Sequence, residues 1–163
     1  ALKDEIILNE GWNLTSSNIL PNQPNLESIF FDNDDIVIIK NNLGSIYYPE
    51  FGLNQIGNWE STQAYQIYVN SKTSIKILGE EVNPSNIEIN LNQGWNLVPY
   101  IRKNSMPIQL ALGNNLNNLV FVKDNLGNYY WPSLNINTIM DLVPGQGYWF
   151  YMSAPEVLVY PGN

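Results

Sequence analysis

Histidine and cysteine are both absent from this chain of 163 residues, and charged residues make up only 13% of it. Without histidine there can be no Ser-His-Asp triad, no imidazole general base and no histidine metal ligand. Without cysteine there can be no disulfide, no thiolate nucleophile and no cysteine zinc site. The sequence has no Gly-rich phosphate loop, and carboxylates such as Glu50, Glu60 and Asp141 stand in unlike contexts. These absences predict a protein that is not an enzyme.

The charge balance argues against two classes of partner. Seven basic and fifteen acidic residues give a net charge of −8, whereas nucleic acids and anionic membrane surfaces both attract a basic face. No apolar run approaches the roughly 20 residues of a membrane span. We therefore expect no nucleic-acid partner and no membrane insertion, and partners that are neutral or cationic. Residues 1–83 carry a net charge of −7 and residues 84–163 a net charge of −1.

Three segments of the chain return at one offset of 83 positions. Residues 7–14 (ILNEGWNL) match 90–97 (NLNQGWNL), residues 40–49 (KNNLGSIYYP) match 123–132 (KDNLGNYYWP), and residues 63–68 (QAYQIY) match 146–151 (QGYWFY). A repeat of this length corresponds to a supersecondary unit rather than to a short solenoid rung. The sequence predicts two tandem modules, residues 1–83 and 84–163, that superpose element by element.

Alternation of apolar and polar residues predicts a mainly β fold, at the margin of α+β. Each module is expected to hold about five strands, one short helix and a helical turn. In the first module we expect strands over Glu5–Ser16, with a bend at Gly11, and over residues 35–40, 45–49, 64–70 and 73–78. The short helix is expected at 24–31, where proline precedes spaced apolar residues, and the helical turn at 53–59. The second module repeats this order, with its helix at 107–112 and its last strand at 157–160.

The recurring motifs resemble those of a known repeat module. Each copy has apolar residues before Gly-Trp-Asn-Leu and a Lys-(Asn/Asp)-Asn-x-Gly hairpin, and the second copy ends in Pro-Gly-Gln-Gly-Tyr-Trp at 144–149. These motifs resemble the GWN…GYW modules of secreted and surface bacterial proteins of the Bacteroidetes kind. The first copy differs at its end, where residues 61–66 have no Pro-Gly. The resemblance covers nearly the whole chain. It implies an extracellular or cell-surface location and attachment to a larger polypeptide, but no particular activity.

Aromatic side chains are the main candidates for ligand contact, because five Trp and ten Tyr supply many flat faces with a polar edge. The shared fold does not require the aromatic residues that differ between the copies, so these are the predicted ligand-binding residues; packing of these rings between the two copies is the alternative. They are Trp59, Tyr100, Tyr129, Trp131 and Trp149. Strand alternation places Tyr129 and Trp131 on one face and Tyr130 on the other, and we expect Tyr130 to point inward.

Two further motifs have a structural and a functional interpretation. Trp12 and Trp95 could be sugar-stacking platforms, but their presence in both copies favours two core residues, with Asn13 and Asn96 satisfying backbone groups at a bend. The second motif is an oxygen-rich loop that contains Asp32, Asp34 and Asp35, which could bind Ca²⁺. It lacks the spacing of an EF-hand, and a solvated acidic turn is the alternative.

The sequence as a whole predicts a non-catalytic extracellular accessory module for binding or adhesion, with a glycan as the first-choice ligand. The alternatives are a passive structural spacer or terminal module of a larger surface protein, and a self-association unit that uses its aromatic residues at an interface.

Overall fold

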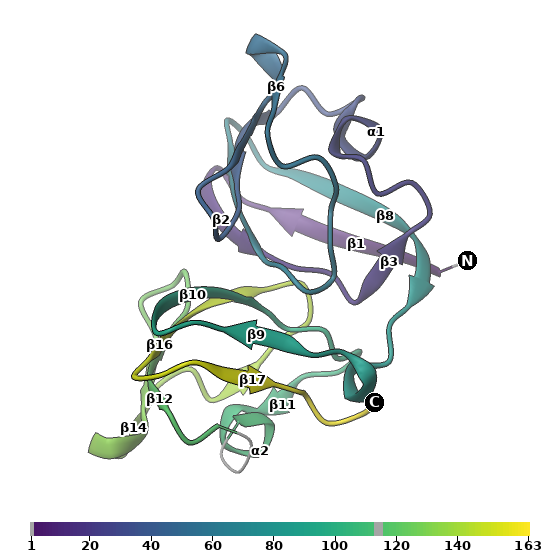
Figure 1. The fold of residues 1–163 in the computed structure, drawn as a ribbon. Coiled ribbons are helices and arrows are strands. Elements are labelled where there is room, and N and C mark those ends of the chain that lie inside the picture. The colour runs from purple at the N-terminus through teal and green to yellow at the C-terminus, as the bar shows by residue number, and fades with distance from the viewer. Residues whose placement is uncertain (1, 113–115) are drawn as a thin grey trace.

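The computed structural model describes residues 2–112 and 116–163, and its chain forms two stacked halves (Figure 1). The N-terminal half is drawn from purple to teal and the C-terminal half from teal to yellow. The fold is mainly β, with 46% of residues in strands, 12% helical and two short α-helices. The expected fold class is therefore confirmed.

Each half contains a five-stranded antiparallel sheet. The first sheet has the order β2 (Gly11–Thr15), β7 (Tyr65–Val69), β4 (Ile36–Lys40), β5 (Ile46–Tyr48) and β6 (Leu53–Asn54). The second has the order β10 (Gly94–Pro99), β16 (Gly147–Met152), β12 (Leu119–Lys123), β13 (Tyr129–Trp131) and β14 (Ile136–Asn137). Their registers also correspond, since Trp12 pairs with Tyr68 and Trp95 with Tyr151. The two sheets thus share strand order and register at the offset of 83 residues.

A smaller sheet faces each five-stranded sheet. In the first half, β8 (Thr73–Glu81) lies between β1 (Leu2–Leu8) and β3 (Ile19–Pro21), and in the second half β9 (Ile89–Leu91) pairs with β17 (Glu156–Leu158). A further two-stranded ladder joins β11 (Met106–Pro107) to β15 (Asp141–Leu142). The helices are α1 (Leu26–Phe30) and α2 (Ile108–Leu112), and 3₁₀ turns occur at η1 (Pro49–Phe51), η2 (Pro84–Asn86) and η3 (Pro132–Leu134). Each half therefore has more strands than the five expected.

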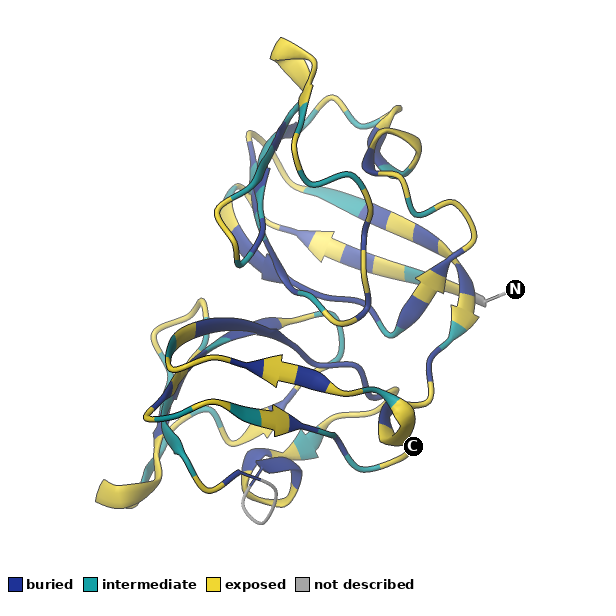
Figure 2. Ribbon diagram, in the orientation of Figure 1, coloured by how far each residue is buried: buried dark blue, intermediate teal, exposed yellow. Residues whose placement is uncertain are grey.

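The hydrophobic core is divided in the same way as the chain. Strands in each half alternate between buried and exposed residues (Figure 2), as expected for sheets with one covered face. One core cluster joins the two sheets and helix of the first half, and a second joins those of the second half. A small third cluster of Leu14, Ala64 and Leu97, with Trp149 against it, lies where the halves meet.

Two of the expected elements are wrong. Residues 5–16 do not form one bent strand, because β1 ends at Leu8 and β2 begins at Gly11 in a different sheet. Residues 53–59 do not form a helical turn either. The turn comes earlier, at η1, where Gly52 closes it in the left-handed conformation with φ 63°. Leu53 and Asn54 then form β6, which pairs with β5.

The two halves are joined by hydrogen bonds around Ser16. Its backbone N–H donates to the Gly145 carbonyl over 3.1 Å. Its hydroxyl accepts the Tyr100 N–H over 3.1 Å and donates to the Gln146 carbonyl. Because Ser16 is fully buried, these bonds satisfy groups that water cannot reach, and they connect the end of β2 to the second half.

The tip of each half's main hairpin also contacts the other half. The Asn42 side-chain oxygen, between β4 and β5, accepts the Leu97 N–H over 2.8 Å. The Asn125 side-chain amide, between β12 and β13, donates to the Trp12 carbonyl over 2.8 Å. Asn42 and Asn125 are themselves 83 residues apart, so the same tip position of each half bonds to the other half, although the backbone group and the direction of the bond differ.

Candidate binding face

The Gly-Trp-Asn motif forms a bend that turns its tryptophan outward. Gly11 and Gly94 open β2 and β10 with φ of 94° and 92°, which only glycine adopts readily. The asparagine two residues later points inward. The Asn13 side chain accepts the Asn9 N–H over 3.0 Å and donates to the Asn9 carbonyl over 2.8 Å. Asn96 makes the same two bonds with Asn92, both 2.8 Å long.

The expectation that Trp12 and Trp95 are core residues is wrong. Their exposed fractions are 42% and 47%. Successive strand residues face opposite sides, and the inward position belongs to the asparagine that holds the bend. The expected role of the two asparagines at the bend is confirmed by their hydrogen bonds.

Each exposed tryptophan lies beside a lysine and a tyrosine on the outer face of its sheet. The Lys40 ammonium lies 5.1 Å from the Trp12 ring centroid, and the Lys123 ammonium 4.9 Å from that of Trp95. Tyr68 meets Trp12 edge-on at 5.2 Å. Such cation–π and edge-to-face contacts hold the ring in place while leaving part of it accessible.

The second sheet adds more aromatic side chains around this group, and we call the whole set the aromatic face. Its side chains share one side of strands β10, β16, β12 and β13 because they occupy alternate and laterally paired positions. The aromatic face consists of Trp95, Phe121, Tyr129, Trp131, Trp149 and Tyr151, with Lys123 among them.

The rings of the aromatic face contact one another in a chain. Trp95 meets Tyr151 at 5.1 Å and Phe121 at 6.1 Å, both edge-on. Phe121 stacks on Tyr129 at 5.5 Å, and its ring is met edge-on by Trp131 at 5.3 Å. Trp131 is 36% exposed. The arrangement presents a partly open surface of aromatic rings that contact one another.

Lys123 provides a positive charge within this face. It pairs laterally with Trp149 on one side and Tyr129 on the other. Within residues 2–112 and 116–163, the ion pair between Lys3 and Glu5 is the only one shorter than 4.0 Å. The ammonium of Lys123 therefore has no carboxylate partner among them, and its contact with the Trp95 ring is a cation–π contact.

The first sheet supplies an internal comparison, because the same backbone positions there are mostly not aromatic. The positions of Phe121, Tyr129, Trp131 and Trp149 are occupied in the first sheet by Ile38, Ile46, Tyr48 and Gln66. The two sheets nevertheless have the same strand order. This sheet architecture therefore does not require the additional aromatic side chains of the second half.

Two of the five predicted ligand-binding residues are buried, which corrects that prediction. Trp59 is 1% exposed and stacks on Tyr65 at 4.3 Å inside the first core. Tyr100 is fully buried, and its hydroxyl donates to the Asn104 carbonyl over 2.6 Å. Both residues differ between the halves because the two cores are packed differently at these positions. A difference between the copies therefore does not indicate a ligand-binding residue there.

The other three predicted residues, Tyr129, Trp131 and Trp149, do lie together on the aromatic face. Trp131 is exposed and the other two are half-buried, and Tyr130 points inward as expected. Trp149 also packs against the cluster between the halves. Trp95 was weighed as a stacking platform but assigned to the core, and Phe121, Tyr151 and Lys123 were not among the predicted ligand-binding residues. Alternation along β12 and β16 was the signal that could have placed Phe121 and Tyr151 beside Tyr129.

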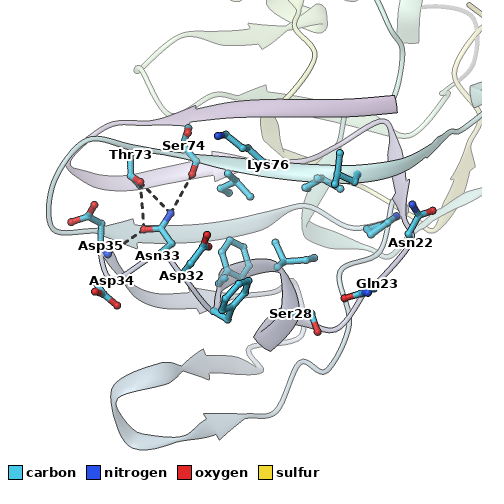
Figure 3. Close-up of a pocket in the computed structure, with 17 residues that line it drawn as sticks. Asn22, Gln23, Ser28, Asp32, Asn33, Asp34, Asp35, Thr73, Ser74 and Lys76 are labelled. Carbon is cyan, nitrogen blue, oxygen red and sulfur yellow. Dashed lines mark hydrogen bonds between the residues drawn. The ribbon is translucent and has the colours of Figure 1, made fainter. Parts of the chain in front are cut away.

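The three aspartates of the candidate calcium site are not gathered into one group of ligands. Among the described residues, no group of three acidic, histidine or cysteine side chains is gathered closely enough to hold a metal ion. Asp32, Asp34 and Asp35 follow α1 along a groove of about 680 Å³ between that helix and β8, and their carboxylates point in different directions (Figure 3). The Asn33 amide donates to Thr73 and Ser74, and Asp35 accepts from Ser71. These bonds support the alternative of a solvated acidic turn.

Burial raises the pKa of several tyrosines in the two cores. It raises the pKa of Tyr65 and of Tyr148, whose hydroxyls accept the backbone N–H groups of Glu60 and Val143. Burial also raises the pKa of Tyr100 and of Tyr160. These phenols stay neutral and support the fold, and none of them belongs to the aromatic face.

Comparison with known proteins gives no family assignment. No protein-family model matches the chain, and neither a curated protein nor a solved structure is significantly similar to it. Within residues 2–112 and 116–163, no helix has the length and apolar character needed to cross a membrane.

Proposed function

We propose that this chain is a non-catalytic binding module that holds an uncharged glycan against its aromatic face. Sugar rings present a patch of C–H groups that stacks on aromatic rings, and hydroxyls that bond with polar edges. Trp131 and Trp95 offer exposed indoles, and Lys123 offers a donor between them. The exposed Trp131 and the half-buried Tyr129 are the side chains best placed for stacking.

The comparison between the two sheets is the observation that carries this proposal. Where the first sheet has isoleucine and glutamine, the second has Phe121, Tyr129 and Trp149. Partly exposed aromatic surface confers no solubility, and a sheet of the same order exists without it. A binding role accounts for this excess, because affinity at most interfaces is concentrated in a few aromatic side chains.

Charge favours a neutral ligand over a polyanion. The chain has a net charge of −8, but residues 84–163, which carry the aromatic face, account for only −1 of it. Sulfated or uronic-acid polymers would be repelled by the molecule as a whole. We further propose that the two halves are copies of one duplicated module, and that the module belongs to a larger secreted or cell-surface polypeptide with a role in adhesion.

A glycan array compared between the wild type and one variant tests the proposal. The variant F121I/Y129I/W131Y gives the second sheet the residues that the first sheet has at the matching positions. Each new side chain is therefore one that the equivalent strand of this protein already carries. It leaves Trp149 in place, because Trp149 also packs between the halves. We expect at least a tenfold loss of affinity for the glycan that the wild type binds best, with and without Ca²⁺.

The matched control is L110A, which removes an exposed apolar side chain of α2 away from the face. It should bind as the wild type does. If the wild type binds no glycan on the array, the proposal is contradicted and the alternative of a passive structural spacer is favoured. Concentration-dependent dimerisation that F121I/Y129I/W131Y abolishes, in the absence of any glycan signal, would favour self-association instead.

A further inference from the structure

The outer face of the first sheet repeats the centre of the aromatic face on a smaller scale. Trp12 is 42% exposed, meets Tyr68 edge-on at 5.2 Å and has the Lys40 ammonium 5.1 Å from its centroid. The corresponding distances around Trp95 are 5.1 Å to Tyr151 and 4.9 Å to Lys123. The lysine and the tyrosine therefore lie at nearly the same distances from both tryptophans, although Trp95 has Phe121 and Trp149 beside it as well.

The surroundings of Trp12 include residues from the other half. The Asn125 side chain, at the tip of the β12–β13 hairpin, donates to the Trp12 carbonyl over 2.8 Å. The next residue, Leu126, is 84% exposed. The hairpin that begins at Lys123 on the aromatic face thus ends beside Trp12, and the two surfaces are fixed relative to each other through this hairpin.

We propose that Trp12, Lys40 and Tyr68 form a second, weaker subsite for the same glycan, so that one chain engages two stretches of the polymer. This inference rests on the proposed function and adds a second point of attachment to it. The same three side chains in the same geometry offer the same chemistry, namely one stacking ring and one ammonium donor.

The size and polarity of this surface favour a sugar over a protein partner. One exposed tryptophan with a half-buried tyrosine and an ammonium beside it matches a single sugar ring with its hydroxyls. A stable protein interface buries roughly 800 Å² on each partner and needs several anchors. Ile38 and Ile46 replace two of the aromatic side chains found in the second sheet, so the subsite binds more weakly.

Two subsites on one rigid chain would raise the affinity for a polymer above that for a short oligosaccharide. Once the aromatic face has bound, the second contact is intramolecular and has a high effective concentration. A short oligosaccharide cannot occupy both subsites at once, so it reports on the stronger one alone. Comparing the two ligands therefore separates the subsites.

The test measures binding of three variants to an immobilised polymer and to a soluble short oligosaccharide of the same sugar, chosen from the array. W12A should lose at least tenfold in apparent affinity for the polymer while its oligosaccharide affinity stays within twofold of the wild type. W131A should weaken both. I46Y/Y48W, which gives the first sheet the aromatic residues of the second, should strengthen polymer binding, a gain that misfolding cannot produce.

The outcomes distinguish this inference from the proposed function. The second subsite is overturned if W12A binds the polymer within twofold of the wild type and I46Y/Y48W gains no affinity. The proposed binding by the aromatic face would stand in that case. If the wild type binds neither the polymer nor the oligosaccharide, both proposals fail.

Discussion

Trp59 and Trp95 are both tryptophans of a β-rich chain, yet their environments are opposite. Trp59 is enclosed by the first core, whereas Trp95 stands on the outer face of β10 with 47% of its surface exposed. The difference follows from the local backbone. In the Gly-Trp-Asn bend the inward position is taken by an asparagine that closes hydrogen bonds to the chain before it. The asparagine is thus the structural residue of the motif, and the tryptophan is free for another role.

Replacing the two kinds of tryptophan should therefore have different costs. Trp59→Ala should lower the free energy of unfolding by about 3–5 kcal/mol, as for other buried aromatic residues. Trp12→Ala should lower it by only about 1–3 kcal/mol, because a ring that is 42% exposed loses less buried surface along with its cation–π and edge-to-face contacts. Urea denaturation measures both. Equal losses in the two variants would contradict the assigned environments.

The asparagine of the bend should contribute more to the free energy of unfolding than an exposed asparagine nearby. Asn96→Ala leaves the Asn92 N–H and the carbonyls of Asn92 and Gly94 without their side-chain partner. We expect a loss of about 1–3 kcal/mol in the free energy of unfolding. Asn90→Ala, at an exposed position of β9, is the control and should change stability by less than about 0.5 kcal/mol. A loss no larger than that of the control would refute the role of Asn96.

At the scale of elements, sequence patterns located most strands and both helices but not every boundary. The expected helix at 107–112 is observed as α2, Ile108–Leu112, and the strand at 35–40 as β4, Ile36–Lys40. Local sequence patterns predicted these two elements because apolar spacing and proline determine the backbone conformation of residues close by in the sequence. They failed at β6, whose two residues are held by pairing with β5 rather than by any propensity of their own.

The candidate site was predictable only in part for a similar reason. Tyr129 and Trp131 could be placed outward from alternation along one strand. Joining them to Phe121, Trp95 and Tyr151 requires the lateral order of β13, β12, β16 and β10, which is set by contacts distant in the sequence. Trp59 and Tyr100 were assigned to the site because no local signal distinguishes a core aromatic residue from an exposed one.

The contact between the halves should depend strongly on one hydroxyl. Ser16→Ala removes the partner of the Tyr100 N–H and of the Gln146 carbonyl at a buried position. We expect thermal unfolding to show a loss of about 1–3 kcal/mol in stability. Ser133→Ala, on the exposed 3₁₀ turn η3, is the matched control. Indistinguishable unfolding of the two variants would mean that this hydroxyl bond does not stabilise the joint.

At the scale of the whole molecule, two separate cores are joined by a small cluster and by one hydrogen bond from the hairpin tip of each half. The acidic charge is concentrated in the first half, and the aromatic face lies on the second, nearly neutral half. The same overall plan thus carries two surfaces of different character.

Alkaline pH should unfold the molecule through its buried phenols. Burial raises the pKa of Tyr47, Tyr65, Tyr100, Tyr148 and Tyr160 above the ordinary value of about 10. The unfolded chain therefore releases these protons at lower pH than the folded chain. The stabilisation is complete below pH 10 and decreases as pH rises above it. We expect phenolate absorbance at 295 nm from these groups to rise together with loss of the β-sheet circular dichroism signal. Their full ionisation in a chain that keeps its circular dichroism signal would contradict the burial assigned to them.

The central claim is that the aromatic face of the second sheet is the ligand-binding surface. It is tested most directly by titrating ¹⁵N-labelled protein with the glycan that the array selects and following the five tryptophan indole N–H signals. We predict that the signals of Trp131 and Trp95 shift as the ligand binds, while that of the enclosed Trp59 stays in place. Saturating ligand that leaves both Trp131 and Trp95 unmoved would contradict the account.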